Sequence, residues 1–137
     1  MVRINKKRSL EIINSLKLCV DLKDKDLEAY FSLLRDKGNK LINNKKTQIV
    51  VDFFTALAHE TRSHIINLLN EKDYCVCELE AILDISQSTI SHHLKILEKI
   101  GLVKGIKRGY FTHYELIKEK FQEYLRIFFQ EYNFIKF

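Results

Sequence analysis

The stretch that decides the fold is Ser86-Gln87-Ser88-Thr89-Ile90-Ser91-His92-His93-Leu94-Lys95-Ile96-Leu97. Ile90, Leu94 and Leu97 recur at helical spacing, so we expect them to share the inner face of a helix. At about 100° per residue, the opposite face carries a polar set. This set is Ser88, Ser91, His92 and Lys95. Because the stretch has no acidic residue, its outer face suits a polyanionic surface read by short hydrogen-bonding side chains.

The segments on either side of this helix indicate a winged helix-turn-helix. A shorter helix is expected over 77–83, and Gly101 stands where the longer helix, 86–100, should stop. Beyond it, two runs rich in β-branched and aromatic residues, 102–106 and 110–116, flank the basic turn Lys107-Arg108-Gly109, which is typical of a β-hairpin. Two helices followed by a hairpin is a DNA-reading order. The expected fold is therefore mainly α with a small β-hairpin wing.

The rest of the chain is predicted to be helical and divides into three parts. Residues 1–45 form an N-terminal helical extension, for dimerisation or as an arm, whose second helix should close at Gly38. Residues 46–116 form the winged helix-turn-helix domain, and 117–137 a C-terminal dimerisation helix. This last helix carries an aromatic stripe through Phe121 and Phe128, and a partner subunit is the simplest cover for it.

Composition narrows the class of protein. The 137 residues carry a net charge of +5 and include four glycines and no proline, so helices should dominate. Positive charge gathers in 1–45 (+5) and 86–116 (+3), whereas 46–85 carries −4, a segregation that suits a polyanion. The chain has no membrane-length apolar run and no cysteine framework of a secreted protein, and its basic N-terminus lacks the apolar stretch that a signal peptide needs. We therefore expect no signal peptide and a cytoplasmic protein. Without a glycine-rich phosphate loop, nucleophile elbow or His-x-x-x-His pair, an enzyme is not expected.

Two cysteines open the shorter helix. Cys75 occupies the expected N-cap, where Ser, Thr, Asp or Asn is normally preferred, so capping does not explain it. A helix N-terminus lowers the pKa of a thiol and favours the thiolate, which is the form that binds metal. The alternatives are that Cys75 and Cys77 are small core residues, or that they form a redox pair, although a disulfide between positions i and i+2 is strained.

Three segments resemble the ArsR/SmtB family of metal-responsive repressors. They are Phe53-Phe54-Thr55-Ala56-Leu57-Ala58 with Thr61-Arg62, then Cys75-Val76-Cys77-Glu78-Leu79, then Ser86 to Lys95. The resemblance covers roughly 47–116 and departs from the family at His59-Glu60, where Asp-Pro is usual, so we expect a softer helix start there. It implies a homodimer, held by the terminal helices, on a near-palindromic operator in double-stranded DNA.

The resemblance also implies roles for individual residues. Base edges or nearby phosphates would be met by Gln87, Ser88, Ser91 and His92. Thr89 and Lys95 would contact the DNA backbone, and Lys107 and Arg108 at the wing tip would reach phosphates or the minor groove. His93 is expected to pack inward, and Arg62 to be a structural ion-pair or capping residue.

Carried over in the same way, Cys75 and Cys77 match the family's metal site on the first helix of the motif. Soft ions need a third or fourth ligand, and Cys19 from the partner subunit is the candidate. Three thiolates would suit As(III) or Sb(III), whereas adding Glu80 or a histidine would favour Zn(II) or Cd(II). Pb(II) is a further candidate. No organic cofactor is expected.

The sequence therefore predicts a sequence-specific DNA-binding transcriptional repressor that metal(loid) binding to cysteine thiolates releases from its operator. Two alternatives remain open within this class: a thiol redox-responsive regulator and an inducer-independent one. From a different class, a winged helix used as a protein-interaction module also fits the pattern. Steep salt dependence of DNA binding would separate the regulators from that module.

Overall fold

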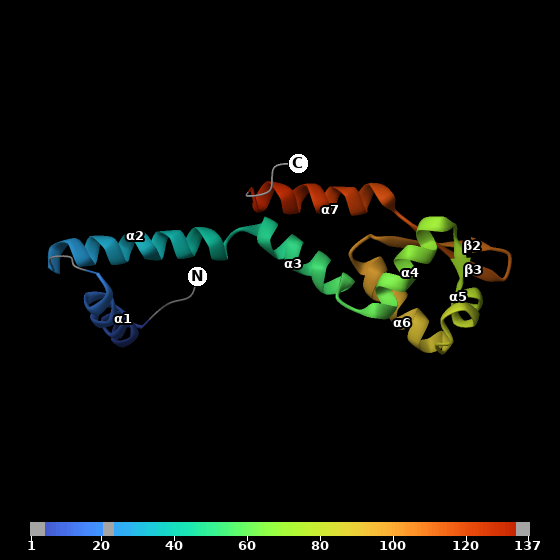
Figure 1. Cartoon of the computed structure of the whole chain (residues 1–137), viewed down its shortest axis with the longest axis horizontal. Coiled ribbons are helices and arrows are strands. Elements are labelled where there is room, and N and C mark those ends of the chain that lie inside the picture. The colour runs from blue at the N-terminus through green and yellow to red at the C-terminus, as the bar shows by residue number, and fades with distance from the viewer. Residues whose placement is uncertain (1–4, 21–23, 134–137) are drawn as a thin grey trace. The chain divides into compact units, whose positions relative to one another are not determined.

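The computed structural model describes residues 5–20 and 24–133, and the chain divides into two compact units, 1–44 and 45–137 (Figure 1). The first unit holds α1 (Lys6–Cys19) and α2 (Asp24–Ile42). Asn5 caps α1, since its side chain accepts from the Arg8 N–H at 2.8 Å. The prediction that Gly38 closes the second helix is wrong. Helix α2 continues through this residue to Ile42. A glycine inside a helix costs only about 1 kcal/mol relative to alanine, which its helical neighbours outweigh.

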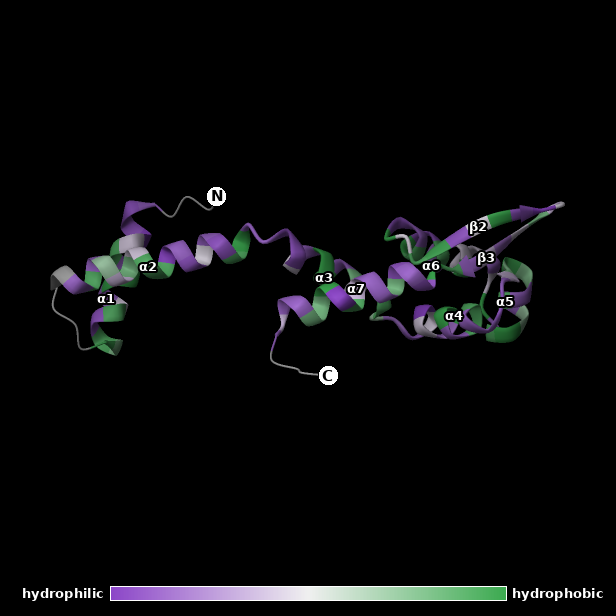
Figure 2. Ribbon diagram, turned by 90° about the horizontal axis from the view of Figure 1, so that it is seen from above, coloured by the Kyte–Doolittle hydropathy of each residue, from purple (hydrophilic) through white to green (hydrophobic). Residues whose placement is uncertain are grey.

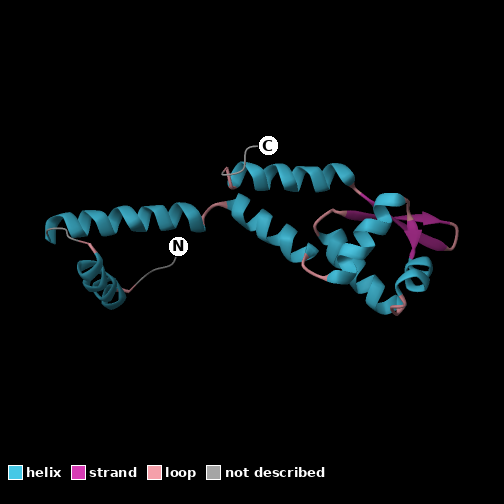
Figure 3. Cartoon of the chain, viewed as in Figure 1, coloured by secondary structure: helices cyan, strands magenta, loops and turns pink. Residues whose placement is uncertain are grey.

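The second unit has the predicted mainly helical architecture with a small antiparallel wing (Figure 3). Its elements are α3 (Lys45–Leu57), α4 (Glu60–Glu71), β1 (Tyr74–Cys75), α5 (Val76–Leu83), α6 (Gln87–Lys99), β2 (Val103–Arg108), β3 (Phe111–Leu116) and α7 (Lys118–Glu131). Helices α5 and α6 are the helix-turn-helix, and β2 and β3 are the hairpin wing. Within the described parts of the chain, no helix is both long enough and apolar enough to span a bilayer.

The hairpin wing belongs to a sheet of three antiparallel strands in the order β1-β3-β2. The hairpin pairs Val103 with Leu116 and ends at the pair of Arg108 and Phe111, next to Gly109, whose φ of 65° is the left-handed conformation a tight turn requires. Strand β1 was not predicted, because two residues are too short to show a strand pattern. It pairs Cys75 with His113 and so joins the start of α5 to the wing.

The core of the second unit lies beneath α6. Ile90, Leu94 and Leu97 are fully buried, which confirms the inner face predicted for this helix. They pack in one cluster with residues from α3, α4, α5 and β2. These partners include Phe53, Ile65, Leu79 and Val103. Figure 2 shows the resulting amphipathic pattern, with green apolar residues alternating with purple polar ones along the helices.

Helix α7 packs on α3 of the same chain, in the same compact unit. The Phe53 ring stacks on Tyr124 with centroids 4.8 Å apart and meets Phe121 edge-on at 5.3 Å, while Phe54 meets Phe128 at 5.0 Å. Part of the aromatic stripe expected to need a partner subunit is therefore covered by α3. Phe54 is still 41% exposed, so an apolar surface remains beside this contact.

Candidate nucleic-acid interface and thiol site

The outer face of α6 presents the predicted polar side chains to solvent. Five are exposed and Ser91 is half-buried. The exposed five are Gln87, Ser88, Thr89, His92 and Lys95. Ser86 caps the helix, with its hydroxyl accepting from the Thr89 N–H at 3.4 Å, and Gln87 Nε2 donates to Glu80 Oε2 at 2.5 Å. The start of α6 is thus fixed to α5 while its outer face stays open.

A buried arginine holds α6 against α3. Arg62 of α4 donates through Nη2 to the Thr55 carbonyl at 3.1 Å and through Nε to the Ala56 carbonyl. Its Nη1 lies 3.3 Å from Nδ1 of His93. Arg62 therefore caps the C-terminal end of α3, and both it and His93 are inward-facing structural residues, as predicted.

Burial lowers the pKa of His93, and the electrostatic effects of the neighbouring His59 and Arg62 lower it further. The ring is therefore held in its neutral form beside the guanidinium. His59 supplies the cap at the start of α4, because its Nδ1 accepts from the Thr61 N–H at 3.2 Å. The departure from the family's Asp-Pro is thus compensated by an imidazole cap.

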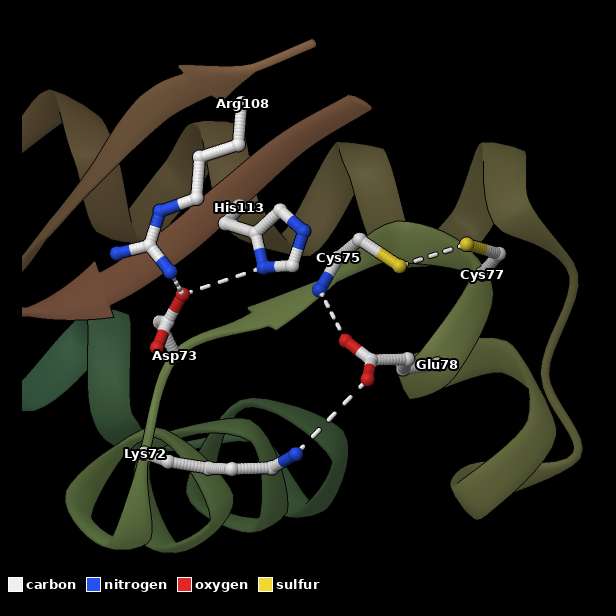
Figure 4. A network of polar contacts seen from close by, with 7 residues as sticks. All are labelled: Lys72, Asp73, Cys75, Cys77, Glu78, Arg108 and His113. Atoms are coloured by element: carbon white, nitrogen blue, oxygen red, sulfur yellow. Dashed lines mark hydrogen bonds and ion pairs between the residues drawn. The ribbon is translucent and has the colours of Figure 1, made fainter. Parts of the chain in front are cut away.

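The wing tip carries the two predicted basic residues, but in a strand and not in the turn. Lys107 and Arg108 are the last residues of β2 and are exposed. Arg108 Nη1 pairs with Asp73 Oδ2 at 2.6 Å, and the same oxygen lies 3.1 Å from His113 Nδ1 (Figure 4). Asp73 was missed in the sequence, because no local pattern pairs residues so far apart along the chain. One carboxylate next to β1 thus contacts both strands of the hairpin.

The thiol pair lies where β1 becomes α5. Cys75 is the last residue of β1 and the N-cap of α5, and its Sγ lies 2.6 Å from that of Cys77 (Figure 4). The Cys75 side chain is buried and that of Cys77 is exposed. Glu78 accepts from the Cys75 N–H at 2.8 Å, and Lys72 lies 3.9 Å from its carboxylate. The two sulfurs therefore lie side by side, and the side chain of Cys77 is exposed to solvent.

The pKa of the Cys75 thiol differs from the prediction. Burial raises the pKa of the Cys75 thiol, and the hydrogen bond with Cys77 raises it further, whereas the Glu78 backbone N–H acts in the opposite direction. Loss of solvation around a thiolate outweighs the helix N-terminus that we expected to lower this pKa. The predicted lowering of the Cys75 pKa is therefore wrong.

The donor set fits a thiophilic ion in part. Cys75 and Cys77 supply two sulfurs, and the described residues contain no group of three or more His, Cys, Asp or Glu side chains that could hold a metal ion. Cys19 is exposed at the end of α1 in the N-terminal unit. The Glu80 carboxylate is engaged by Gln87. The structure thus brings together two of the three cysteine side chains that the sequence predicts as ligands.

An exposed polar helix followed by a basic-edged wing defines a winged helix-turn-helix DNA-binding regulator. Residues 59–104 match the family described as "Bacterial regulatory protein, arsR family". The chain is 39% identical over 83 residues to the "Cadmium resistance transcriptional regulatory protein CadC" of Listeria innocua, an overlap of 58% of this chain and 70% of the relative. The chain belongs to the arsR family of bacterial transcriptional regulators, which are not enzymes.

A second relative and a solved structure support this assignment. The "Arsenical resistance operon repressor" of Escherichia coli is 45% identical over 67 residues, covering 48% of this chain and 57% of that protein. The structure of an ArsR-like transcriptional regulator from Rhodococcus sp. RHA1 matches with a TM-score of 0.58 and 26% identity, over 64% of this chain and 81% of that one.

Proposed function

We propose that this chain is a repressor that binds a near-palindromic operator as a homodimer and leaves it when a thiophilic metal or metalloid binds Cys75 and Cys77. The observation that carries the DNA part is the solvent-facing side of α6 over residues 87–97, which has no acidic residue. Gln87, Ser88, Ser91 and His92 would meet base edges or nearby phosphates, and Thr89 and Lys95 the backbone. Lys107 and Arg108 would extend the contact from the wing.

Support for the inducer comes from the converging sulfurs and from the relatives. The names of the two relatives speak of cadmium and arsenical resistance. Two thiols 2.6 Å apart can contact one ion, and thiolates favour soft ions such as As(III), Sb(III), Cd(II), Pb(II) and, less strictly, Zn(II). A third thiolate would come from Cys19 of the other subunit.

Dimerisation would use the terminal parts of the chain. Phe54, beside Phe128 of α7, is an apolar side chain of the second unit that a partner subunit would cover. Residues 1–45 would add a helical extension or arm and 117–137 the dimerisation helix. Measuring the molar mass of the full chain by sedimentation tests this arrangement, and a monomer bound to a complete operator would contradict it.

We expect Lys107→Ala to weaken operator binding several-fold and to reduce the slope of log affinity against log salt by about one, because one phosphate contact is lost. Fluorescence anisotropy at several salt concentrations measures both quantities. Lys104→Ala is the matched control, since Lys104 lies on the same strand but is paired with Glu115 at 2.8 Å. A salt-independent affinity would instead favour a protein-interaction module.

We expect Asp73→Asn to tighten operator binding several-fold and to steepen the salt slope by about one. The carboxylate at 2.6 Å neutralises Arg108, so removing its charge frees the guanidinium for a phosphate. The same anisotropy assay applies. In an Arg108→Ala background the substitution should have no effect, and an equal effect in both backgrounds would show that Asp73 acts in another way.

A further inference from the structure

A hollow of about 310 Å³ is lined by α4, by α7 and by the last residue of β3. Its walls combine an apolar part with a polar part. The apolar part is Ile66, Leu116 and Phe121, and the polar part is Asn67, Asn70, Lys118 and Gln122. This volume lies at the lower end of the range for small-molecule sites, so the hollow suits a ligand of roughly ten non-hydrogen atoms.

The apolar side of the hollow continues into the core of the second unit. Ile66, Leu116 and Phe121 are half-buried and pack against the buried cluster beneath α6. The Phe121 ring meets Phe53 edge-on with centroids 5.3 Å apart, so it is held in place by the core. A ligand ring that contacts a fixed aromatic side chain gains more than the apolar area it buries. These walls therefore suit a compact aromatic body.

The polar side of the hollow carries one charge, and that charge is positive. Lys118 donates through Nζ to the Asn70 carbonyl at 3.4 Å, which occupies one of the three ammonium donors and does not neutralise the cation. None of the described residues that line the hollow is acidic. The exposed side chains of Asn67, Asn70 and Gln122 add carboxamide donors around it. This set suits an anionic head group.

The position of Lys118 in its helix adds to the positive potential at the hollow. Lys118 is the first residue of α7, and the N-cap residue Ile117 provides no side-chain cap. The dipole of a helix makes its N-terminus positive, so a cation there is unfavourable for α7 itself. Glu119, the acidic residue of the same turn, does not line the hollow. A carboxylate bound here would interact with both the ammonium and the helix N-terminus.

We propose that this hollow binds a small aryl carboxylate, with its ring against Leu116 and Phe121 and its carboxylate at Nζ of Lys118. A single ammonium among neutral carboxamides favours a monoanion over a phosphate dianion. The site is separate from the thiol pair, since neither Cys75 nor Cys77 lines it. The inference therefore adds a second class of ligand and does not depend on the proposed metal response.

The test is calorimetry on the full-length reduced protein with phenylacetate and three matched compounds. Phenylacetamide keeps the ring and removes the charge, acetate keeps the carboxylate and removes the ring, and phenylethylammonium reverses the charge. We expect one phenylacetate per chain with a dissociation constant of about 1 mM or below. Phenylacetamide should bind about fivefold more weakly, because it loses the interactions with the ammonium and the helix N-terminus. Acetate and phenylethylammonium should show no saturable binding.

Lys118→Gln should reduce the preference for phenylacetate over phenylacetamide to about twofold while leaving phenylacetamide binding unchanged. Lys120→Gln is the matched control, since Lys120 lies on the same helix, pairs with Glu123 at 2.9 Å and does not line the hollow. Asn67→Trp should abolish binding of both compounds, because the indole fills the hollow. Asn67 is exposed, so the substitution is tolerated, and circular dichroism checks the fold.

Equal affinities for phenylacetate and phenylacetamide would overturn the inference, as would the absence of saturable phenylacetate binding. Equal effects of Lys118→Gln and Lys120→Gln would also overturn it, and so would phenylacetate binding that Asn67→Trp leaves unchanged. The Cys75→Ser protein should bind phenylacetate as the unsubstituted protein does. If thiophilic ions leave operator affinity unchanged while phenylacetate still binds, the inducer part of the proposed function fails and this inference stands.

Discussion

Cys75→Ser should abolish the response of operator binding to thiophilic ions while leaving binding in their absence within about twofold of the unsubstituted protein. In the unsubstituted protein, saturating inducer should weaken operator affinity by about tenfold to a hundredfold, the usual range of coupling between two sites. Serine removes one of the two converging sulfurs but keeps a small side chain at a helix N-cap, a position that serine favours. Anisotropy titrations of labelled operator with As(III), Sb(III), Cd(II), Pb(II) and Zn(II) measure both effects.

Cys77→Ser should give the same loss, because a single thiol cannot hold the ion in place. Cys19→Ser separates the two forms of the site, since it removes the response only if that thiol completes the ligand set. A Cys75→Ser protein that still leaves its operator on addition of the same ions would place the sensor elsewhere. A response to peroxide but to none of the ions would identify a redox regulator instead.

Arg62→Ala should lower the free energy of unfolding by about 3 kcal/mol and the melting temperature by about 10 °C. The guanidinium is buried and bonds the carbonyls of Thr55 and Ala56, and it lies next to Nδ1 of His93. Its removal leaves buried acceptors unpaired at the junction of α3, α4 and α6. Urea unfolding followed by circular dichroism measures the change.

Arg126→Ala on α7 is the control for the loss of an arginine, since Arg126 is exposed and its truncation should change stability by less than 0.5 kcal/mol, roughly the limit for surface sites. Arg62→Lys should recover only part of the loss, because an ammonium group lacks the planar fork that reaches two carbonyls and a ring nitrogen. A destabilisation below about 1 kcal/mol in Arg62→Ala would mean that water replaces these bonds.

The helix-turn-helix and the hairpin could be predicted because their signals are local. Ile90, Leu94 and Leu97 mark the inner face of α6 by spacing alone, and the buried cluster confirms them. The hairpin runs and their glycine turn are likewise adjacent in sequence. The roles of Arg62 and His93 followed from the position of His93 on that face and from the family resemblance. The DNA contacts of α6 remain predictions for the experiments above.

What the sequence could not show depends on residues that are far apart along the chain. Strand β1 exists only because Tyr74 and Cys75 find β3, some forty positions later. The pairing of Asp73 with Arg108 follows from that same strand pairing. The raised pKa of Cys75 has a similar origin, since folding buries a side chain whose local helix position indicated the opposite shift. The local sequence pattern does not show how far the folded chain removes this thiol from water.

Because Cys75 both ends a strand and begins a helix, no spacer residue separates the sulfur pair from the sheet that carries the wing. This direct connection would affect the design of any biosensor engineered from this chain. Substitutions on β3 chosen to retune inducer selectivity, at His113 opposite Cys75 or at its neighbour Tyr114, would also shift the baseline occupancy of the promoter. Inducer selectivity and the level of repression without inducer would therefore have to be optimised together, by screening pairs of substitutions and not single ones.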